Sequence, residues 1–306
     1  MPKKVIVILN RGSGGRDGET REATIRRAFA RHGYDVDIMS FNPRNGVERA
    51  ARAALEAKPD IIAVSGGDGT ICAVASVMAG SVQTMAVIPS GTFNYFARSL
   101  DLPEDIDRAV DVIATGQKRP TNIAMINDSV FLNNTSIGAY SAILQNREGI
   151  YAKWGRSRIA AYWSVIKTLA TFRAPLKITV TIDGTAREYR TPLVFVMNNA
   201  FQLDQMNLPG RAHIENGQMV LLIAPHTNRW GLLKNAMALG MGIAKPKSDY
   251  ELHGAAEFCI DMKRKRRAVA RDGEISKMAG PFNLRVVHGA LDVIVPSETA
   301  ATEAVR

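Results

Sequence analysis

The stretch AVSGGDGTICAV, residues 63–74, joins two apolar runs through three glycines, and one aspartate, Asp68, stands among them. The residues before the glycines, DIIAVS (60–65), are typical of a buried strand, and TICAVASVMAG (70–80) has the length of a helix and ends at a glycine. Glycine lets backbone N–H groups approach a ligand because no Cβ stands in the way. The stretch therefore predicts a strand, a ligand-facing turn and a helix that begins at the turn.

The first 120 residues repeat this alternation of strand and helix. Further strands are expected at 4–10, 34–41 and 84–91, and further helices at 17–33, 46–58 and from 92 onward. Strands separated by helix-length segments predict parallel βαβ units, with helices on both faces of one sheet. In the first helix, Ile25, Ala28 and Phe29 share one face, which we expect to be buried.

The second part of the chain changes to short strands separated by turn residues. They are expected at 122–127, 129–138, 176–184, 187–199, 217–224, 255–262, 267–273, 282–289 and 291–296, with helices at 152–172 and 228–244. Asp-Gly at 183–184 and 272–273 and Asn-Gly at 216–217 are typical of hairpin turns. The sequence thus predicts an antiparallel β domain over residues 121–296, whose last strand could return to the first domain, and a tail at 297–306.

Composition limits the partners. The chain has 306 residues and a formal net charge of +10 at pH 7, which favours an anionic partner such as a nucleotide, membrane phosphate or nucleic acid. No zinc-ligand, helix-turn-helix or RNA-binding signature is present, so a nucleic acid is not expected. Cys72 and Cys259 lack metal or disulfide spacing and are typical of core residues in a reducing compartment. No apolar stretch reaches transmembrane length, so we expect a cytoplasmic protein that could still contact the inner face of the membrane.

Three turns in the first domain have unusual chemistry: NRGSGG (10–15), SGGDGT (65–70) and PSGTFN (89–94). They follow the first, third and fourth strands, and ligands of parallel sheets collect beyond the carboxyl ends of the strands. The helix after each turn would offer N–H groups and the positive end of its dipole. The hydroxyls able to donate to phosphate oxygens are those of Ser13, Thr70, Ser90 and Thr92. Together the turns predict a phosphate-binding edge, although the first turn alone is typical of any βα connection.

Asp68 is the one carboxylate in these turns. An aspartate repels phosphate unless a cation intervenes, which makes Asp68 a candidate for orienting Mg²⁺–nucleotide or for proton transfer. The alternative is an N-cap of the helix that follows. The sequence contains neither G-x-x-x-x-G-K-[ST] nor G-x-G-x-x-G, which argues against a P-loop protein and against an ordinary dinucleotide-binding dehydrogenase.

Four motifs carry a resemblance to a known family: ILNRGSGG (8–15), VSGGDGT (64–70), IPSGTFNYFAR (88–98) and ARDGE (270–274). In their order and spacing they resemble the diacylglycerol kinase catalytic-domain family, which includes bacterial soluble lipid kinases and the sphingosine kinases. NAD kinases share a related GGDG turn and are the nearest alternative. The resemblance implies an N-terminal α/β domain that binds ATP, a C-terminal antiparallel β-sandwich domain for the lipid, and a site between the two.

The resemblance also implies roles for single residues. ATP would be bound by Asn10, Ser13, Ser40, Gly66, Gly67, Asp68, Gly69, Thr70, Ser90, Gly91, Thr92 and Asn94. Glu274 matches the position of the general base, and Asp68 would organise Mg²⁺. A structural Mg²⁺ would lie at His213, Asn216 and Gln218. Two positions depart from the family pattern: Tyr95 stands where aspartate is common, and Asn216 replaces an aspartate ligand, which lowers the charge at that metal site.

The expected function is therefore an ATP- and Mg²⁺-dependent lipid kinase that transfers a γ-phosphoryl group to the hydroxyl of diacylglycerol or a related lipid at the membrane surface. Two alternatives stay open: a NAD kinase-like phosphotransferase, and a non-catalytic regulator that binds nucleotide or lipid. The basic and aromatic segment 151–173 is typical of an interfacial helix or of a packed amphipathic helix. The basic run 262–271 fits a charged strand edge or a membrane patch. The oligomeric state stays open, with a dimer as one option.

Overall fold

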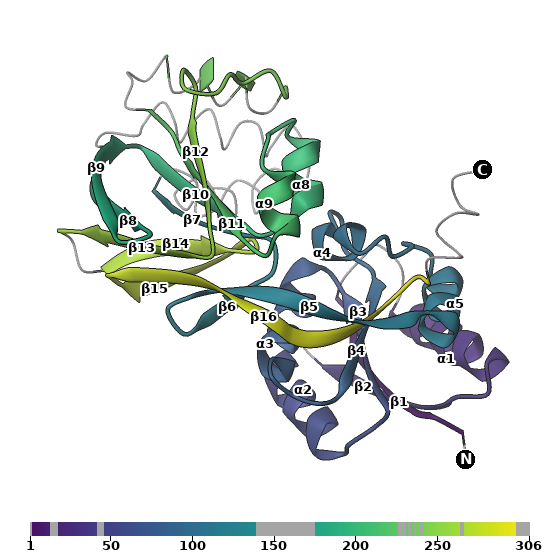
Figure 1. The fold of residues 1–306 in the computed structure, drawn as a ribbon. Helices are drawn as coiled ribbons and strands as arrows, with labels where there is room; N and C mark the ends of the chain where they lie inside the picture. Colours follow the sequence, from purple (N-terminus) through teal and green to yellow (C-terminus); the bar gives the residue numbers. More distant parts are fainter. Residues whose placement is uncertain are drawn as a thin grey trace, which may run out of the picture. The chain divides into compact units, whose positions relative to one another are not determined.

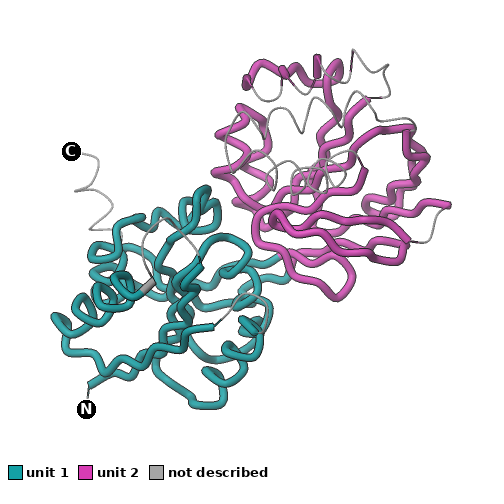
Figure 2. Tube along the Cα trace, turned by 180° about the vertical axis from the view of Figure 1, so that it is seen from behind, with its two compact units in different colours: residues 1–123, 287–306 teal, residues 124–286 magenta. Residues whose placement is uncertain are grey.

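The structure is a computed structural model (Figure 1) that describes residues 2–12, 18–41, 46–138, 175–225, 231, 234–235, 237–238, 241–263 and 266–297. The chain divides into two compact units, coloured separately in Figure 2: unit 1 comprises residues 1–123 and 287–306, and unit 2 comprises residues 124–286. The division after residue 123 falls close to the predicted boundary at 120. The helix predicted at 152–172 and Ser13 lie outside the described residues.

Unit 1 is a parallel sheet covered by helices. Its elements are β1 (Lys4–Asn10), α1 (Gly18–Arg31), β2 (Asp35–Phe41), α2 (Val47–Glu56), β3 (Ile61–Gly66), α3 (Asp68–Met78), β4 (Thr84–Pro89), α4 (Tyr95–Ser99) and α5 (Ile106–Thr115). β1 pairs in parallel with β2 and with β3, and β3 pairs in parallel with β4, which gives the order β2–β1–β3–β4. The predicted α/β architecture is confirmed, with α5 as a helix that the pattern did not predict.

The core of unit 1 forms because its central strands are apolar on both faces. Val7 of β1 packs in one cluster with Phe29 of α1 and Val110 of α5. Side chains alternate along a strand, so the intervening residues of β1 face the other side of the sheet, where α2 and α3 lie (Figure 1). Ile25, Ala28 and Phe29 are fully buried, as predicted.

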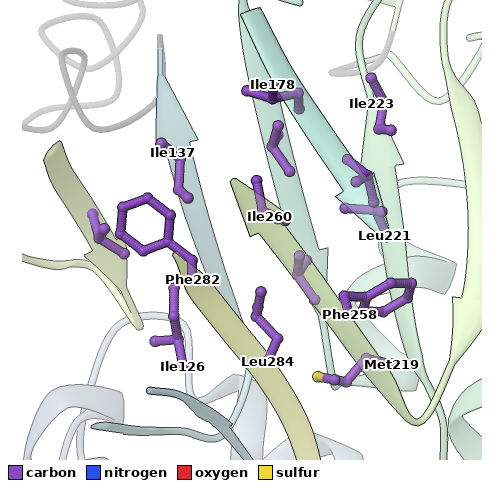
Figure 3. Close-up of a cluster of buried hydrophobic side chains, with 14 of the residues drawn as sticks. Ile126, Ile137, Ile178, Met219, Leu221, Ile223, Phe258, Ile260, Phe282 and Leu284 are labelled. Carbon is purple, nitrogen blue, oxygen red and sulfur yellow. The ribbon is translucent and has the colours of Figure 1, made fainter. Parts of the chain in front are cut away.

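Unit 2 is an antiparallel β-sandwich. Its elements, with the two strands that connect the units, are β5 (Gln117–Ile126), β6 (Ser129–Phe131), β7 (Asn134–Gly138), β8 (Leu176–Ile182), β9 (Thr185–Thr191), β10 (Leu193–Met197), α8 (Ala200–Gln205), α9 (Arg211–Glu215), β11 (Met219–Ile223), β12 (Glu251–Ala255), β13 (Glu257–Met262), β14 (Arg266–Arg271), β15 (Glu274–Ala279) and β16 (Phe282–Val295). One sheet has the order β12–β11–β10–β7–β14–β15, and the other contains β13, β8 and β9. Buried side chains from both sheets, among them Ile137, Leu221 and Ile260, pack in one cluster (Figure 3). The predicted β-sandwich is confirmed.

The last strand of the chain, β16, belongs to both units. It pairs antiparallel with β13 at its start and parallel with β4 near its end, so it returns to the first sheet. The prediction of two separate strands at 282–289 and 291–296 is wrong. Gly289, with a φ of +58°, lies inside one continuous strand, and its N–H donates to Oδ1 of Asn122 at 3.0 Å.

Two other predicted strands are each divided in two. The strand predicted at 129–138 breaks between β6 and β7. There the carboxylate of Asp272 accepts three consecutive backbone N–H groups at 2.7, 2.9 and 3.0 Å, those of Leu132, Asn133 and Asn134. The strand predicted at 187–199 breaks at Pro192, which has no N–H to donate to a neighbouring strand.

Two of the three predicted hairpin turns are confirmed. β8 and β9 meet at Asp183–Gly184, and β14 and β15 meet at Asp272–Gly273, with positive φ at all four residues. The hairpin predicted at 216–217 is wrong: Asn216 is the C-cap of α9, and Gly217, with a φ of +72°, ends that helix before β11. Asn-Gly suits both settings, because a hairpin turn and a helix end each favour positive φ.

Asp272 and Asp183 occupy the same place in two Asp-Gly hairpins, but Asp272 also binds three backbone N–H groups of residues that are at most 5% exposed. Asp272→Ala should lower the free energy of unfolding by about 3 kcal/mol, roughly 1 kcal/mol for each lost bond. Asp183→Ala is the matched control and should cost less than about 1 kcal/mol, because it removes only the tolerance of aspartate for positive φ. Urea denaturation measures both changes, and equal losses would contradict the special role of Asp272.

Candidate functional site

The carboxyl ends of β1, β3 and β4 lie side by side in the sheet of unit 1. Leu9 of β1 pairs with Ser65 of β3, and Gly66 of β3 pairs with Pro89 of β4. The turns that follow these strands therefore start at one edge of the sheet. We call this region the glycine-rich edge; it comprises the described residues of the turns at 10–15, 65–70 and 89–94.

Glycine is required where the second and third turns meet. A Cβ on Gly91 would lie 2.6 Å from Cα of Gly67, closer than two such atoms approach in real proteins. A Cβ on Gly66 would lie 2.6 Å from Cβ of Thr70. The backbone N–H of Ser90 donates to the carbonyl of Gly66 at 3.0 Å. The two turns are thus in backbone contact, and a side chain at Gly91 would push them apart.

The first turn is attached to the start of α3. Asn10, at the end of β1, donates from Nδ2 to Oγ1 of Thr70 at 2.9 Å, and its Oδ1 accepts the backbone N–H of Gly12 at 3.0 Å. Arg21 of α1, only 3% exposed, donates to the carbonyl of Asn10 at 3.0 Å. Asn10 and Thr70, which the resemblance assigned to different motifs of one site, are in direct contact.

Arg11 holds Ser40 beside the first turn. Nε of Arg11 donates to Oγ of Ser40 at 3.1 Å, and its guanidinium forms an ion pair with Glu22 at 2.7 Å. Hydrogen bonds from Arg11 and then from Arg26 lower the pKa of Glu22, because both guanidinium groups stabilise the ionised carboxylate. Arg11 was not among the predicted site residues, although its place directly after Asn10 in the first turn was a visible signal.

Asn94 closes the third turn. It is 2% exposed and has a φ of +51°, and its side chain binds both backbone groups of Gly91: Oδ1 accepts the N–H at 2.9 Å and Nδ2 donates to the carbonyl at 3.2 Å. Thr92 is exposed. The rings of Phe93 and Tyr95 stack, with 5.5 Å between centroids and 5° between planes. Tyr95, where the sequence departs from the family pattern, therefore contributes an aromatic surface next to the third turn.

Asp68 is the first residue of α3, but it does not cap that helix. The N-cap is Gly67, and no side chain caps the helix there. Oδ1 of Asp68 accepts the backbone N–H of Phe96, in the first turn of α4, at 3.2 Å. The alternative prediction, that Asp68 is the N-cap of α3, is therefore wrong. Its carboxylate instead connects the second turn to α4, the helix that follows the third turn. No local sequence signal connects Asp68 with α4.

Glu274 belongs to unit 2, where it is the exposed first residue of β15. It follows the Asp272–Gly273 turn and pairs with Arg271 of β14. Arg271 donates to the carbonyl of Val130 at 2.7 Å, and Asp272 binds the backbone of 132–134. The hairpin end that carries Glu274 is thereby fixed to the chain on either side of the β6–β7 break.

A cluster of buried amides adjoins this segment. Nδ2 of Asn199 donates to Oδ1 of Asn133 at 2.7 Å, and Nδ2 of Asn134 donates to Oε1 of Gln202 at 3.0 Å. Asn199 also caps α8 by accepting the N–H of Gln202 at 3.0 Å. All four residues are at most 7% exposed. This cluster was not predicted from the sequence, although the dipeptides Asn133–Asn134 and Asn198–Asn199 each stand at the end of an apolar run.

The three predicted ligands of a structural Mg²⁺ lie at the end of α9. Nδ1 of His213 and Oε1 of Gln218 are 2.6 Å apart, and Asn216 is the C-cap. The ring of His213 packs against Gly254, where any Cβ would collide with it. Across the described ranges, no group of three or more His, Cys, Asp or Glu side chains is arranged to hold a metal ion, so this metal site stays a prediction.

Comparison with known proteins assigns both parts of the chain. Residues 4–126 match the family model of the diacylglycerol kinase catalytic domain, and residues 138–295 match that of the YegS C-terminal NAD kinase beta sandwich-like domain. The chain belongs to the diacylglycerol kinase catalytic-domain family. The resemblance carried by the four motifs is confirmed, and the family supports a lipid kinase.

Individual members of the family agree with this assignment. A diacylglycerol kinase of Bacillus subtilis (strain 168) is 30% identical to this chain over 185 residues. The match covers 60% of this chain and 60% of that relative's length. A diacylglycerol kinase of Staphylococcus carnosus (strain TM300) is 22% identical over 313 residues, 100% of this chain and 99% of the relative. A solved diacylglycerol kinase structure from Bacillus anthracis str. Sterne superposes on this chain with a TM-score of 0.70 at 22% sequence identity. The match covers 96% of this chain and 97% of the solved chain, and it confirms the fold. In the part of this chain that the structure describes, no helix is long and apolar enough to span a membrane.

The bond from Phe96 to Asp68 predicts different effects for two substitutions. Asp68→Ala should lower the melting temperature by roughly 2–4 °C, because a lost helix cap costs about 1 kcal/mol. Asp68→Asn keeps an oxygen for the N–H of Phe96 and should melt close to the wild type. Asp105→Ala removes the N-cap of α5, which accepts the N–H of Arg108 at 3.1 Å, and should cost about as much as Asp68→Ala. Calorimetry that finds Asp68→Asn as unstable as Asp68→Ala would speak against the capping role.

Proposed function

We propose that this chain is a lipid kinase that transfers the γ-phosphoryl group of ATP, in the presence of Mg²⁺, to the hydroxyl of diacylglycerol or a related lipid. The observation that carries the proposal is the contact between Gly67 and Gly91, which joins two glycine-rich turns with no side chain between them. Such a backbone surface suits phosphates. Family membership supports a lipid as the acceptor, and the names of the B. subtilis and S. carnosus relatives support diacylglycerol in particular.

The start of α3 would bind the phosphates. Gly69 and Thr70 lie in its first turn, where backbone N–H groups have no acceptor within the helix, and Gly67 supplies no side-chain cap. Oγ1 of Thr70 already accepts from Asn10, so its hydroxyl hydrogen would be directed to a phosphate oxygen. Arg11 would add a positive charge at the same edge, which strengthens hydrogen bonds to phosphate.

A Mg²⁺ ion fits this edge in company with the phosphates. Asp68 is the single carboxylate of the three turns, and Mg²⁺ commonly takes one or two carboxylates together with phosphate oxygens and waters. The bond from Phe96 to Oδ1 would hold the Asp68 carboxylate in one orientation. When bound, the ion supplies positive charge that stabilises the phosphoryl group during transfer.

Glu274 would accept the proton of the lipid hydroxyl as the hydroxyl oxygen bonds to the γ-phosphorus and the bond to ADP breaks. Its side chain is exposed at a hairpin end, where a substrate can reach it. Asp272 fixes that hairpin through three backbone hydrogen bonds. A carboxylate that is accessible and carried on a rigid turn suits a general base.

Two alternatives explain fewer of these features. A NAD kinase-like phosphotransferase would use the same glycine-rich edge, but the relatives named above are diacylglycerol kinases. A non-catalytic regulator is favoured by Tyr95, which stands where the family commonly has aspartate, and would bind ATP without transferring phosphate. Offering NAD and a panel of lipids in one assay separates the three functions.

Incubation with radiolabelled ATP and this panel should label a lipid and leave NAD unlabelled. Glu274→Gln should reduce kcat by roughly 100-fold or more, because a general base contributes at least that factor, while ATP affinity stays within about twofold. Transfer kinetics and isothermal titration with ATP measure the two effects.

Glu257→Gln is the matched control, because Glu257 is also an exposed first residue of a strand in unit 2. It should leave kcat unchanged. Secure ATP binding with no labelled product from the native protein would defeat the lipid kinase proposal. Full activity of Glu274→Gln would remove only the role given to Glu274.

A further inference from the structure

Unit 2 exposes three large apolar side chains within a short segment. Met237, Met241 and Ile243 are 57%, 64% and 60% exposed. In the part of the chain that the structure describes, the other exposed large apolar residues are Val82 and Phe93, which belong to unit 1 and are distant from this segment in the sequence. We call Met237, Met241 and Ile243 the apolar patch. Single exposed apolar residues are common on protein surfaces, whereas three in one place indicate a surface that binds something.

The backbone directs these side chains outward together. The N–H of Met241 donates to the carbonyl of Met237 at 2.9 Å, so the two side chains lie one helical turn apart on the same face. The N–H of Ile243 donates to the carbonyl of Ala238 at 2.9 Å, and Gly242 has a φ of +67°, which is the pattern of a Schellman helix end. The helix end therefore places Ile243 directly after the helical pair.

The segment is anchored to the rest of unit 2 through the residues between the exposed ones. Nδ2 of Asn207, just after α8, donates to the carbonyl of Gly242 at 2.8 Å. A Cβ on Gly242 would lie 3.1 Å from Cβ of Asn207, so the two backbones are close. Ala244 packs against the buried cluster that contains Leu203 and Tyr250. Gly242 and Ala244 thus contact the rest of unit 2, whereas the side chains of Met241 and Ile243 are exposed.

Three exposed lysines lie along the same segment: Lys234, Lys245 and Lys247. We call them the lysine rim. Asp249 partly offsets their charge: it accepts the N–H of Lys245 at 2.9 Å, this bond lowers the pKa of Asp249, and the charges of Lys234 and Lys245 lower it further. The N–H of Lys247 donates to the carbonyl of Tyr250 at 2.8 Å, which closes a tight turn over residues 247–250. The patch is therefore apolar at its centre and cationic at its margin.

We propose that the apolar patch and the lysine rim dock this protein on a bilayer that contains anionic phospholipid. Met and Ile side chains would enter the boundary between headgroups and acyl chains, and the lysines would contact lipid phosphates. The inference rests on the proposed function, since a lipid kinase must reach a substrate held in a bilayer. A second copy of the chain is a poorer occupant, because a two-fold contact centred on the patch would bring the two lysine rims together.

Vesicle sedimentation of the full chain, without ATP, tests the proposal. The wild type should bind vesicles of phosphatidylcholine with phosphatidylglycerol and should bind phosphatidylcholine alone much more weakly. Replacing Met241 and Ile243 together by Ser should lower the partition coefficient roughly tenfold or more, because two buried apolar side chains are lost. Replacing Lys245 and Lys247 together by Gln should lower it roughly tenfold on the anionic vesicles alone.

Val82→Ser is the matched control, because Val82 is an apolar residue of unit 1 that is 88% exposed and far from the patch in the chain. It should bind vesicles as the wild type does. Three results would overturn the proposal: wild-type binding by the Met241/Ile243 variant, equal loss in Val82→Ser, or a dimer of the wild type that the Met241/Ile243 variant abolishes while neither protein binds vesicles.

Phosphorylation of lipid dispersed in detergent micelles keeps this test separate from the proposed function. The Met241/Ile243 variant should phosphorylate micellar lipid at the wild-type rate, because the patch contains none of the residues of the glycine-rich edge and not Glu274. Vesicle binding without phosphorylation of any lipid would support the docking surface and contradict the kinase proposal. Phosphorylation of micellar lipid without vesicle binding would support the kinase proposal and contradict the docking surface.

Discussion

The contact between Gly67 and Gly91 is the constraint on which the glycine-rich edge depends. A Cβ on Gly91 would lie 2.6 Å from Cα of Gly67, so position 91 requires glycine, and a Cβ on Gly67 would lie only 3.2 Å from Cα of Gly91. α3 begins directly at the contact, so the N–H groups of its first turn, which have no acceptor within the helix, lie at the edge of the sheet. Asn10 binds the first turn to Thr70, and Asp68 binds α4, so three turns that are distant in sequence share one helix start. A surface built this way consists of amides, hydroxyls and one carboxylate, which is the chemistry that a Mg²⁺–triphosphate requires.

In unit 2 the carboxylate of Asp272 holds the backbone in place through hydrogen bonds, whereas in unit 1 the turns are held by the close approach of two glycines. Asp272 takes the place of a neighbouring strand for three backbone N–H groups, and the amides of Asn133 and Asn199 bind each other next to that break. Burying such polar groups is costly unless they are hydrogen-bonded, and when bonded they hold one conformation. The same hairpin carries Glu274, so the feature that interrupts the strand pattern also determines how an exposed carboxylate is presented.

The sequence could predict the parts of the fold that depend on local pattern. Alternating apolar runs and helix-length segments predict the parallel sheet of unit 1, and Asp-Gly turns predict two hairpins of unit 2. The wrong strand predictions arise where a hydrogen-bond partner distant in the sequence determines where a strand breaks or continues. The strand predicted at 129–138 breaks because Asp272 binds its backbone, and β16 is continuous through Gly289, which Asn122 holds. The Asn-Gly at 216–217 satisfies a hairpin and a helix end equally well, so local preference could not distinguish them.

The candidate site could be predicted in its residue types but not in its contacts. Glycines and hydroxyls after three strands indicated the phosphate-binding edge. The partner of Asp68, the N–H of Phe96, depends on how α4 packs, and the contact of Arg11 with Ser40 depends on the pairing of β1 with β2. Neither leaves a periodic pattern in the sequence.

If backbone amides of the glycine-rich edge bind the triphosphate of ATP, a bound nucleotide must protect them from exchange with solvent. Hydrogen–deuterium exchange of the full chain, with and without a non-hydrolysable ATP analogue and Mg²⁺, measures this protection. Exchange should slow at 66–70 and 90–94 when the analogue is bound and stay unchanged at the exposed hairpin turn 183–184. Unchanged exchange at both glycine-rich turns under saturating analogue would show that these amides do not bind the triphosphate.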